Sequence, residues 1–251
     1  IDEATQATEP AALVPLIRGA RQVVLVGDHR QLPPTVISYR AENGGLRRSL
    51  FERMVEMGIE PYLLTKQYRM HPAISKFPND QFYNSQLEDG VSAANRTAPA
   101  GLLWPDWENP VAFLPVKGGE VVSPDGTSRE NPTEVAWIIR ILDDFLDAGE
   151  LEKGDIGVIT PYAGQVRAIR HSMREALDDI EVRSVDGYQG REKEVIIFSC
   201  VRSNDDGNIG FLSDPRRLNV ALTRAKRGLI VIGDPDTLRS DPIWTNWLEY
   251  V

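Results

Sequence analysis

Short runs of apolar, β-branched residues alternate along this chain with segments that have the spacing of helices. Strands that are apolar throughout are buried on both faces, and strands separated by helices run parallel to one another. The pattern therefore predicts an α/β protein, with a parallel sheet covered by helices on both faces. In such sheets ligands bind beyond the carboxyl ends of the strands. The predicted strands are residues 23–26, 62–64, 111–114, 156–160, 194–201 and 229–232.

The clearest predicted helix begins after Asn131. Asn131 can cap the helix, Pro132 suits the first helical position, and Glu134 stands three residues after the cap. Apolar residues then recur at i, i+3, i+4 and i+7 until Gly149 ends the pattern. Further helices are predicted near residues 46–55, 166–177 and 214–225, and residues 84–131 are predicted to be irregular apart from one strand.

Composition excludes several classes of protein. The 251 residues allow one large or two ordinary domains, and no apolar run approaches the ~20 residues of a membrane span, so no membrane partner is expected. Cys200 is the only cysteine and lies in an apolar run, which predicts an inert core residue without a disulfide or cysteine-based metal site. The net charge of −9 argues against a uniformly basic nucleic-acid-binding surface, although a local basic groove is compatible with it.

Several polar segments carry residue types suited to phosphate chemistry. Asp2 and Glu3 are adjacent carboxylates. In such a pair one carboxylate can bind a Mg²⁺ ion and the other can position a water molecule. Gln31 lies in a polar loop directly after the predicted strand at residues 23–26. Tyr68 could stack on a base, and Arg69 could bind a phosphate through two parallel hydrogen bonds. Each segment alone also has a structural interpretation: a solvated dipeptide, a proline-ended turn, or a core tyrosine beside a surface ion pair.

Residues 216–227 form a basic segment that the pattern places on a helix. Arg217, Ala221 and Arg224 would share one side of it. A basic helix is usually a solvated face. Arg224, however, stands beside a small residue just before a predicted buried strand, so it is a candidate for pointing into a cleft.

Together these segments resemble the ATPase and helicase motifs of superfamily 1 helicases. Five motifs occur in the family's order across nearly the whole chain, so the chain is expected to run from motif II to motif VI. They are residues 2–6 (motif II), 27–34 (motif III), 67–72 (the glutamine-tyrosine-arginine motif), 184–192 (motif V) and 216–227 (motif VI).

Other segments narrow the resemblance to the up-frameshift RNA helicases of nonsense-mediated mRNA decay, also called regulators of nonsense transcripts. Senataxin and the immunoglobulin mu-binding helicase share much of this core and stay open as alternatives. The narrowing segments are residues 6–10, 49–53, 90–96 and 209–217.

The resemblance implies a RecA-like fold of the P-loop NTPase type, in which ATP lies between two domains and single-stranded nucleic acid crosses their top. Residues 1–66 would be the C-terminal portion of a first RecA-like domain. Residues 67–251 would be an essentially complete second one.

The resemblance also implies roles in ATP hydrolysis. Asp2 would hold Mg²⁺, Glu3 would orient and deprotonate the attacking water, and Gln31 would sense the γ-phosphate. Arg69 and Arg224 would act as arginine fingers.

Other residues would contact the two ligands from the second domain. Tyr68 would pack on the adenine, and Gly190 and Glu192 would contact the nucleotide from the motif V loop. Asp186 would orient that loop. Backbone amides and hydroxyls near strand ends would hold nucleic-acid phosphates without reading sequence, and Tyr162 could stack on a base or be structural. The implied nucleic-acid residues are Thr160, Pro161, Tyr162, Ser184 and Val185.

The family's phosphate-binding Gly-x-x-x-x-Gly-Lys-Ser/Thr loop does not occur here, because none of the 20 glycines is followed by lysine. The chain alone is therefore expected to hydrolyse no ATP and to unwind nothing. Apolar surface near residues 23–26 is expected to be exposed or covered by a neighbour, because the implied first domain would lack most of its sheet.

The function that follows is that of an ATP-dependent RNA helicase core, translocating on single-stranded RNA with other mRNA-decay factors. A cytoplasmic location is expected, with the nucleus as the alternative. A DNA helicase of the same superfamily is a second interpretation, because backbone contacts tolerate both nucleic acids and the 2′-hydroxyl is the relevant difference. A non-catalytic binding domain is a third.

Overall fold

The computed structural model describes residues 1–251, which divide into two compact units, Ile1–Leu64 and Thr65–Val251. The division falls two residues before the boundary expected from the sequence.

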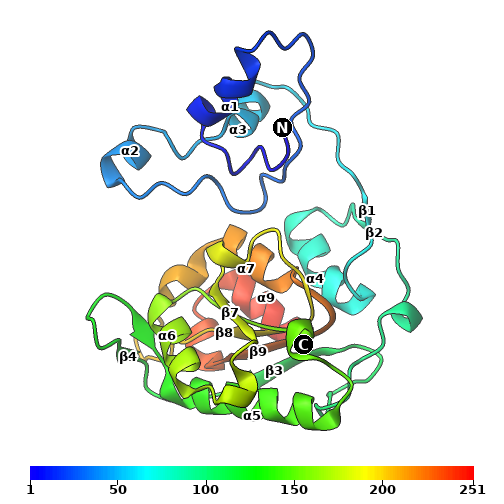
Figure 1. Cartoon of the computed structure of the whole chain (residues 1–251), viewed down its shortest axis with the longest axis vertical. Helices are drawn as coiled ribbons and strands as arrows, with labels where there is room; N and C mark the ends of the chain where they lie inside the picture. The colour runs from blue at the N-terminus through cyan, green and yellow to red at the C-terminus, as the bar shows by residue number, and fades with distance from the viewer. The chain divides into compact units, whose positions relative to one another are not determined.

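A five-stranded parallel sheet forms the centre of the second unit (Figure 1). The strand order is β3-β9-β8-β6-β7, and every neighbouring pair is parallel. The prediction of a RecA-like α/β fold is therefore confirmed. The strands are β3 (Val111–Pro115), β6 (Ile156–Thr160), β7 (Glu181–Ser184), β8 (Lys193–Ser199) and β9 (Ala225–Gly233).

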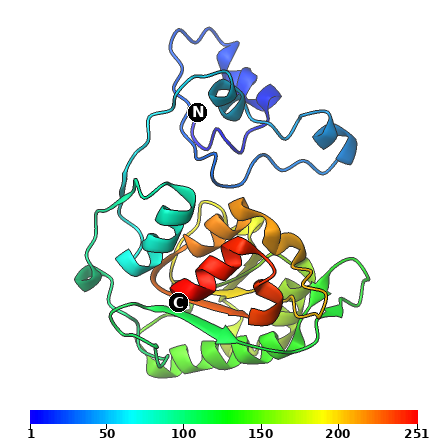
Figure 2. The same cartoon turned by 180° about the vertical axis from the view of Figure 1, so that it is seen from behind.

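Successive residues of each strand point to opposite faces of this sheet, and helices cover both faces. On one face Val195 and Ile197 of β8 join the core formed with α5 (Pro132–Ala148) and α6 (Ala163–Ser172). On the other face Phe198 stacks on Trp244, with ring centroids 6.2 Å apart. Figure 2 shows α9 (Pro242–Tyr250, red) of this second face in front of the strands, with α7 (Pro215–Leu222, orange) above it and α4 (Pro72–Phe82, cyan) to the left in that view.

Helix α5 follows its prediction closely. The Asn131 side chain accepts hydrogen bonds from the backbone N–H of Thr133 (3.1 Å) and of Glu134 (3.2 Å). Gly149 ends the helix with φ of 71°, a left-handed conformation that glycine adopts without strain. The apolar face of the helix lies in the core.

Two predicted helices end earlier than expected. Helix α6 ends at Ser172, and Leu177 lies in a separate 3₁₀ turn, where it is still buried. Helix α7 ends at Leu222, because Ala225 already pairs with Lys193 as the first residue of β9.

Residues 84–131 contain more regular structure than the single strand expected there. The additional elements are short. They are β2 (Glu88–Asp89), which pairs with β1 (Lys66–Gln67), the 3₁₀ turn η1 (Ala93–Asn95), and the hairpin of β4 (Val121–Val122) and β5 (Arg129–Glu130). The unit also has a short α8 (Pro235–Leu238) and the 3₁₀ turns η2 (Lys153–Asp155), η3 (Glu175–Leu177), η4 (Asp186–Tyr188) and η5 (Gly210–Ser213).

The first unit contains three short helices: α1 (Glu9–Leu16), α2 (Tyr39–Asn43) and α3 (Leu50–Glu56). Its only β pairing is an isolated bridge between Thr8 and Ser49. The helix expected near residues 46–55 begins only at Leu50, where Ser49 caps it by accepting a hydrogen bond from Glu52 N–H (3.1 Å).

The strands predicted at residues 23–26 and 62–64 do not form. Residues 23–26 have backbone partners on one side only, as in the bonds from Val26 N–H to Ile1 C=O (2.9 Å) and from Ala4 N–H to Val26 C=O (2.8 Å). Val24 is 71% exposed and Leu64 is 84% exposed. The expectation of exposed apolar surface near residues 23–26 is confirmed. None of the helices in either unit has the length and apolar character needed to cross a bilayer.

Candidate functional site

The loop at residues 67–71 is shaped by the Gln67 amide. Its Oε1 accepts hydrogen bonds from Arg69 N–H (2.9 Å) and Met70 N–H (2.8 Å), and its Nε2 donates to Asp89 Oδ1 (2.6 Å). His71 N–H donates to the Lys226 carbonyl (2.8 Å), which ties the loop to β9. Gln67 is thus a structural amide that aims Arg69.

Arg69 and Arg224 meet at Thr223. Arg69 Nη1 donates to the Thr223 carbonyl (3.0 Å), and Arg224 Nη2 donates to the Thr223 hydroxyl (2.9 Å). Arg224 Nε also donates to the Val220 carbonyl (3.0 Å). Arg224 is buried, whereas the Arg69 side chain is 31% exposed. The structure therefore brings together two arginines that lie far apart in the sequence, through a threonine that the sequence analysis did not single out.

Glu192 connects this pair to a third cation. Its Oε2 accepts a hydrogen bond from Arg69 Nε (2.6 Å), and its Oε1 lies 3.2 Å from Lys226 Nζ. Burial favours a higher pKa for the Glu192 carboxyl, but the hydrogen bonds and charges of Arg69 and Lys226 outweigh it and lower that pKa. Glu192 is therefore occupied by protein cations. Lys226 and its second partner Glu194, 3.3 Å away, were missed because both resemble ordinary surface charges in the sequence.

Tyr68 is presented to solvent beside this cluster and is 63% exposed. Its ring lies over Gly90, where a Cβ would come within 2.5 Å of the ring. Arg96 fixes the loop from behind, donating to the carbonyls of Arg69 (2.9 Å) and Tyr68 (3.1 Å). The exposed ring is free of steric cover and suited to stacking on a flat ligand. Gly190 has φ of +74°, which explains a glycine in the motif V loop.

The carboxylates expected at the active site lie in the first unit. Glu3 has φ of 48°, a left-handed conformation rare for a non-glycine residue, and its N–H donates to Asp2 Oδ1 (2.9 Å). Gln31 Nε2 donates to Asp28 Oδ2 (2.9 Å). The Asp2–Glu3 segment lies beside the Gln31 loop, because Ala4 N–H donates a hydrogen bond to the carbonyl of Val26, which comes just before that loop. The two carboxylates of Asp2 and Glu3 are exposed.

The structure holds no group of three or more His, Cys, Asp or Glu side chains that could bind a metal by themselves. Mg²⁺ does not need such a cage, because it keeps several waters and binds through one or two carboxylates together with substrate phosphates. An exposed carboxylate pair fits that requirement.

The residues expected to contact nucleic acid gather at the carboxyl ends of β6 and β7. Val185 N–H donates to the Thr160 carbonyl (3.2 Å), and the Ser184 hydroxyl accepts from Gly187 N–H (3.2 Å). The side chains of Thr160 and Val185 are fully buried, so only their backbone could meet a ligand. Pro161 is half-buried.

The structure corrects the expectation that the Tyr162 ring could stack on a base. The residue is only 4% exposed. Its hydroxyl donates to the Ile209 carbonyl (3.3 Å) and accepts from Phe211 N–H (3.2 Å). Burial raises the pKa of this hydroxyl. The side chain therefore holds the loop before α7 in place.

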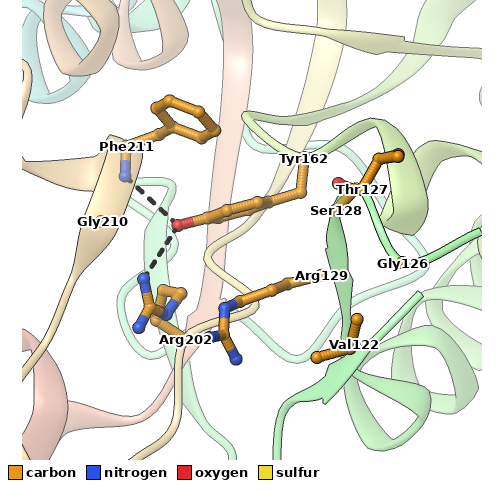
Figure 3. Close-up of a pocket in the computed structure, with 9 residues that line it drawn as sticks. All are labelled: Val122, Gly126, Thr127, Ser128, Arg129, Tyr162, Arg202, Gly210 and Phe211. Atoms are coloured by element: carbon orange, nitrogen blue, oxygen red, sulfur yellow. Dashed lines mark hydrogen bonds between the residues drawn. The ribbon is translucent and has the colours of Figure 1, made fainter.

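The Asp186 carboxylate lies 3.3 Å from Arg217 Nε, an ion pair that links the motif V loop to α7. Beyond β6 and β8 a cavity of about 540 Å³ opens between Tyr162, Arg202, Phe211 and the β4–β5 hairpin (Figure 3).

Two protein-family models match parts of this chain. The AAA domain family represented by AAA_12 matches residues 46–236, and a second AAA domain family, AAA_11, matches residues 1–39. Among solved structures, the PRRSV helicase aligns with a TM-score of 0.48 and 18% identity, over 96% of this chain and 35% of that chain.

Three relatives illustrate the sequence similarity. The regulator of nonsense transcripts 1 homolog of Drosophila melanogaster is 47% identical over 100% of this chain and 22% of its own length. The homolog of Arabidopsis thaliana is 49% identical over 100% of this chain and 20% of its own length. ATP-dependent helicase NAM7 of Saccharomyces cerevisiae is 46% identical over 99% of this chain and 26% of its own length. This chain thus spans about a quarter of the length of these relatives, and its sequence is similar to theirs. It belongs to the AAA domain family whose model matches residues 46–236.

Proposed function

We propose that this chain is helicase-core sequence of an ATP-dependent RNA helicase, which couples ATP hydrolysis to movement along single-stranded RNA in nonsense-mediated mRNA decay. The observation that carries the proposal is the convergence of Arg69 and Arg224 on Thr223. A chain freed from nucleotide chemistry has no physical reason to orient two guanidinium groups through one residue. The first unit would be the tail of one RecA-like domain, and the second unit another RecA-like domain.

Arg69 and Arg224 would stabilise the negative charge that builds up on the transferring phosphoryl group. Arginine fingers of this kind are worth roughly 10³–10⁵ in rate. Glu192 and Thr223 position Arg69, since each accepts a hydrogen bond from its guanidinium. Glu192 is therefore assigned to holding Arg69 as well as to the nucleotide contact expected from the motif.

Asp2 would hold Mg²⁺, and Glu3 would orient and deprotonate the attacking water. Gln31, hydrogen-bonded to Asp28, would report on the terminal phosphate, and Tyr68 would stack on the adenine. Bound ATP supplies the bond to be broken, and Mg²⁺ neutralises charge on its phosphates. The chain contains no phosphate-binding Gly-Lys-Ser/Thr segment, so alone it is expected to show no turnover.

Nucleic-acid phosphates would be held at the carboxyl ends of β6 and β7 by the backbone of residues 160–162 and 184–185. Contacts of this kind do not read sequence. The protein would act on RNA in the cytoplasm together with other mRNA-decay factors.

A chimera tests this proposal: this chain replaces the matching 22% of the Drosophila relative, and RNA-stimulated ATPase is measured. Arg224→Lys, which keeps the charge but not the planar guanidinium, is expected to lower turnover by about 10³-fold in assays run well below the variant's own thermal midpoint. Arg140→Ala, on the exposed side of α5, is the matched control and should leave turnover unchanged.

Full turnover in the Arg224→Lys chimera contradicts the assignment of Arg224. Turnover by the isolated 251-residue chain, abolished by the same substitution, contradicts the need for a separate phosphate-binding loop. Equal stimulation by single-stranded DNA and RNA favours the DNA-helicase alternative.

A further inference from the structure

The cavity beyond β6 and β8 is built by four loops that the sequence keeps far apart. Tyr162 follows β6, Arg202 follows β8, Phe211 lies in η5, and Arg129 belongs to the β4–β5 hairpin. Figure 3 shows the Phe211 ring above the edge of Tyr162, with both arginines below it. The volume of about 540 Å³ is far larger than a phosphate needs and falls in the range of small-ligand pockets.

The floor of the cavity carries one positive charge in excess. Arg129 Nη1 and Arg202 Nε lie 2.7 Å and 2.5 Å from the two oxygens of the same carboxylate, Glu120. Glu120 also accepts hydrogen bonds from Ser203 N–H (3.1 Å) and Asn204 Nδ2 (3.2 Å), so four donors already share its two carboxylate oxygens. Arg202 is buried, whereas the Arg129 side chain is 40% exposed and can reach a second anion.

The wall of the cavity is an aromatic face held in place from behind. Phe211 is 55% exposed, and its ring centroid lies 5.5 Å from that of Tyr162. Tyr162 fixes the backbone of Phe211 through the hydrogen bond from Phe211 N–H. Gly210 makes this approach feasible, because a Cβ there would lie 2.2 Å from Arg202 Nη1. Arg217 approaches the same ring, with its Cζ 5.3 Å from the centroid.

A single exposed aromatic residue is unremarkable on a protein surface. Here it stands over a pocket with hydroxyls, an available arginine and net positive charge, and that combination suits a base with its phosphate. We infer that this cavity takes one nucleotide of a single strand, with the base stacked on Phe211 and the phosphate on Arg129. The inference rests on the proposed function, and it adds a base contact to what was otherwise a backbone-only interface.

The experiment is a binding cycle on the 251-residue chain at low salt, read by fluorescence anisotropy of a labelled oligouridine. One probe is intact, and the other has its bases removed at every position. Phe211→Ala should weaken binding of the intact strand about tenfold, and Phe211→Trp, which keeps an aromatic face, should stay near the unaltered chain. The abasic strand should bind the unaltered chain and Phe211→Ala equally. Arg129→Gln should lower the slope of log affinity against log salt by about 0.7, the value for one phosphate on a single strand.

Two failures are distinguishable. The base pocket is wrong, while the proposed function stands, if the unaltered chain binds the intact strand and Phe211→Ala binds it equally well. The same conclusion follows if Phe211→Ala weakens binding of the intact and the abasic strand alike. If the unaltered chain binds neither strand, the nucleic-acid interface of the proposed function is overturned and this inference with it. Near-ultraviolet circular dichroism checks that the exposed substitution leaves the fold intact.

Discussion

The two units of this chain contain apolar segments of the same kind with opposite outcomes. In the second unit Val195 and Ile197 of β8 pair on both sides and are fully buried. In the first unit residues 23–26 are all apolar as well, yet they pair on one side only and Val24 is 71% exposed. Apolar, β-branched sequence is therefore not sufficient for a strand. A neighbour on each side and a cover over each face decide whether it forms.

The same difference separates the two sets of candidate functional groups. In the second unit the candidate groups lie in loops next to the five-stranded sheet. Hydrogen bonds to one another or to Thr223 fix the side chains of Arg69, Arg224 and Glu192. Asp2 and Glu3 stand in irregular backbone with exposed side chains. Groups on a packed scaffold are pre-organised, whereas groups on an uncovered segment gain precision only when something orders them.

The largest expected effect compares one leucine from each unit. Leu142, fully buried in α5, should cost about 2–5 kcal/mol of unfolding free energy when changed to Ala, because a cavity is left in the core. Leu64, 84% exposed at the end of the first unit, should cost less than about 0.5 kcal/mol. Urea denaturation, followed by far-ultraviolet circular dichroism that reports on the helices of both units, measures both. Equal losses would break the comparison.

A second effect concerns a buried acid that only the second unit has. Glu134 is fully buried and accepts hydrogen bonds from the Ser199 hydroxyl (2.5 Å) and Val201 N–H (2.9 Å). Burial raises the pKa of its carboxyl from 4.5 to about 8. Between these values the folded chain keeps a proton that the unfolded chain releases, so stability should fall as pH rises from about 5 to about 8, by at most ~1.4 kcal/mol per pH unit.

Glu134→Gln should remove that slope, because glutamine keeps the acceptor for Val201 and cannot ionise. The exposed Glu88→Gln is the control and should leave the slope intact. Urea denaturation at several pH values measures both variants. A slope that persists in Glu134→Gln would show that another group is responsible.

Sequence reasoning succeeded where local signals agree with tertiary context. Asn131, Pro132 and Gly149 mark both ends of α5, and uniformly apolar runs identified β3, β6, β8 and β9. It failed at residues 23–26 and 62–64, because the apolar pattern says nothing about whether neighbouring strands are present. The helix predicted at residues 214–225 is longer than α7, because Ala225 suits a helix as well as the strand β9 that it begins.

The candidate site shows the same limit. The motifs made Arg69, Arg224 and Glu192 candidates, but Thr223 and Lys226 look like ordinary residues until the fold brings them next to these side chains. Tyr162 was considered for an open stacking role because its loop leaves a sheet edge. Its burial depends on residues 202–211, which no local pattern connects to it.

Hydrogen exchange of the monomeric chain tests the contrast between the two units most directly. Amides of residues 195–199 should exchange only through global unfolding, and those of residues 22–27 through local opening, so the first set should be slower by about a thousandfold or more. Sedimentation in the same buffer establishes that the chain is monomeric. Exchange at residues 22–27 as slow as in β8 would contradict the account, because it would show that the first unit is as firmly built as the second.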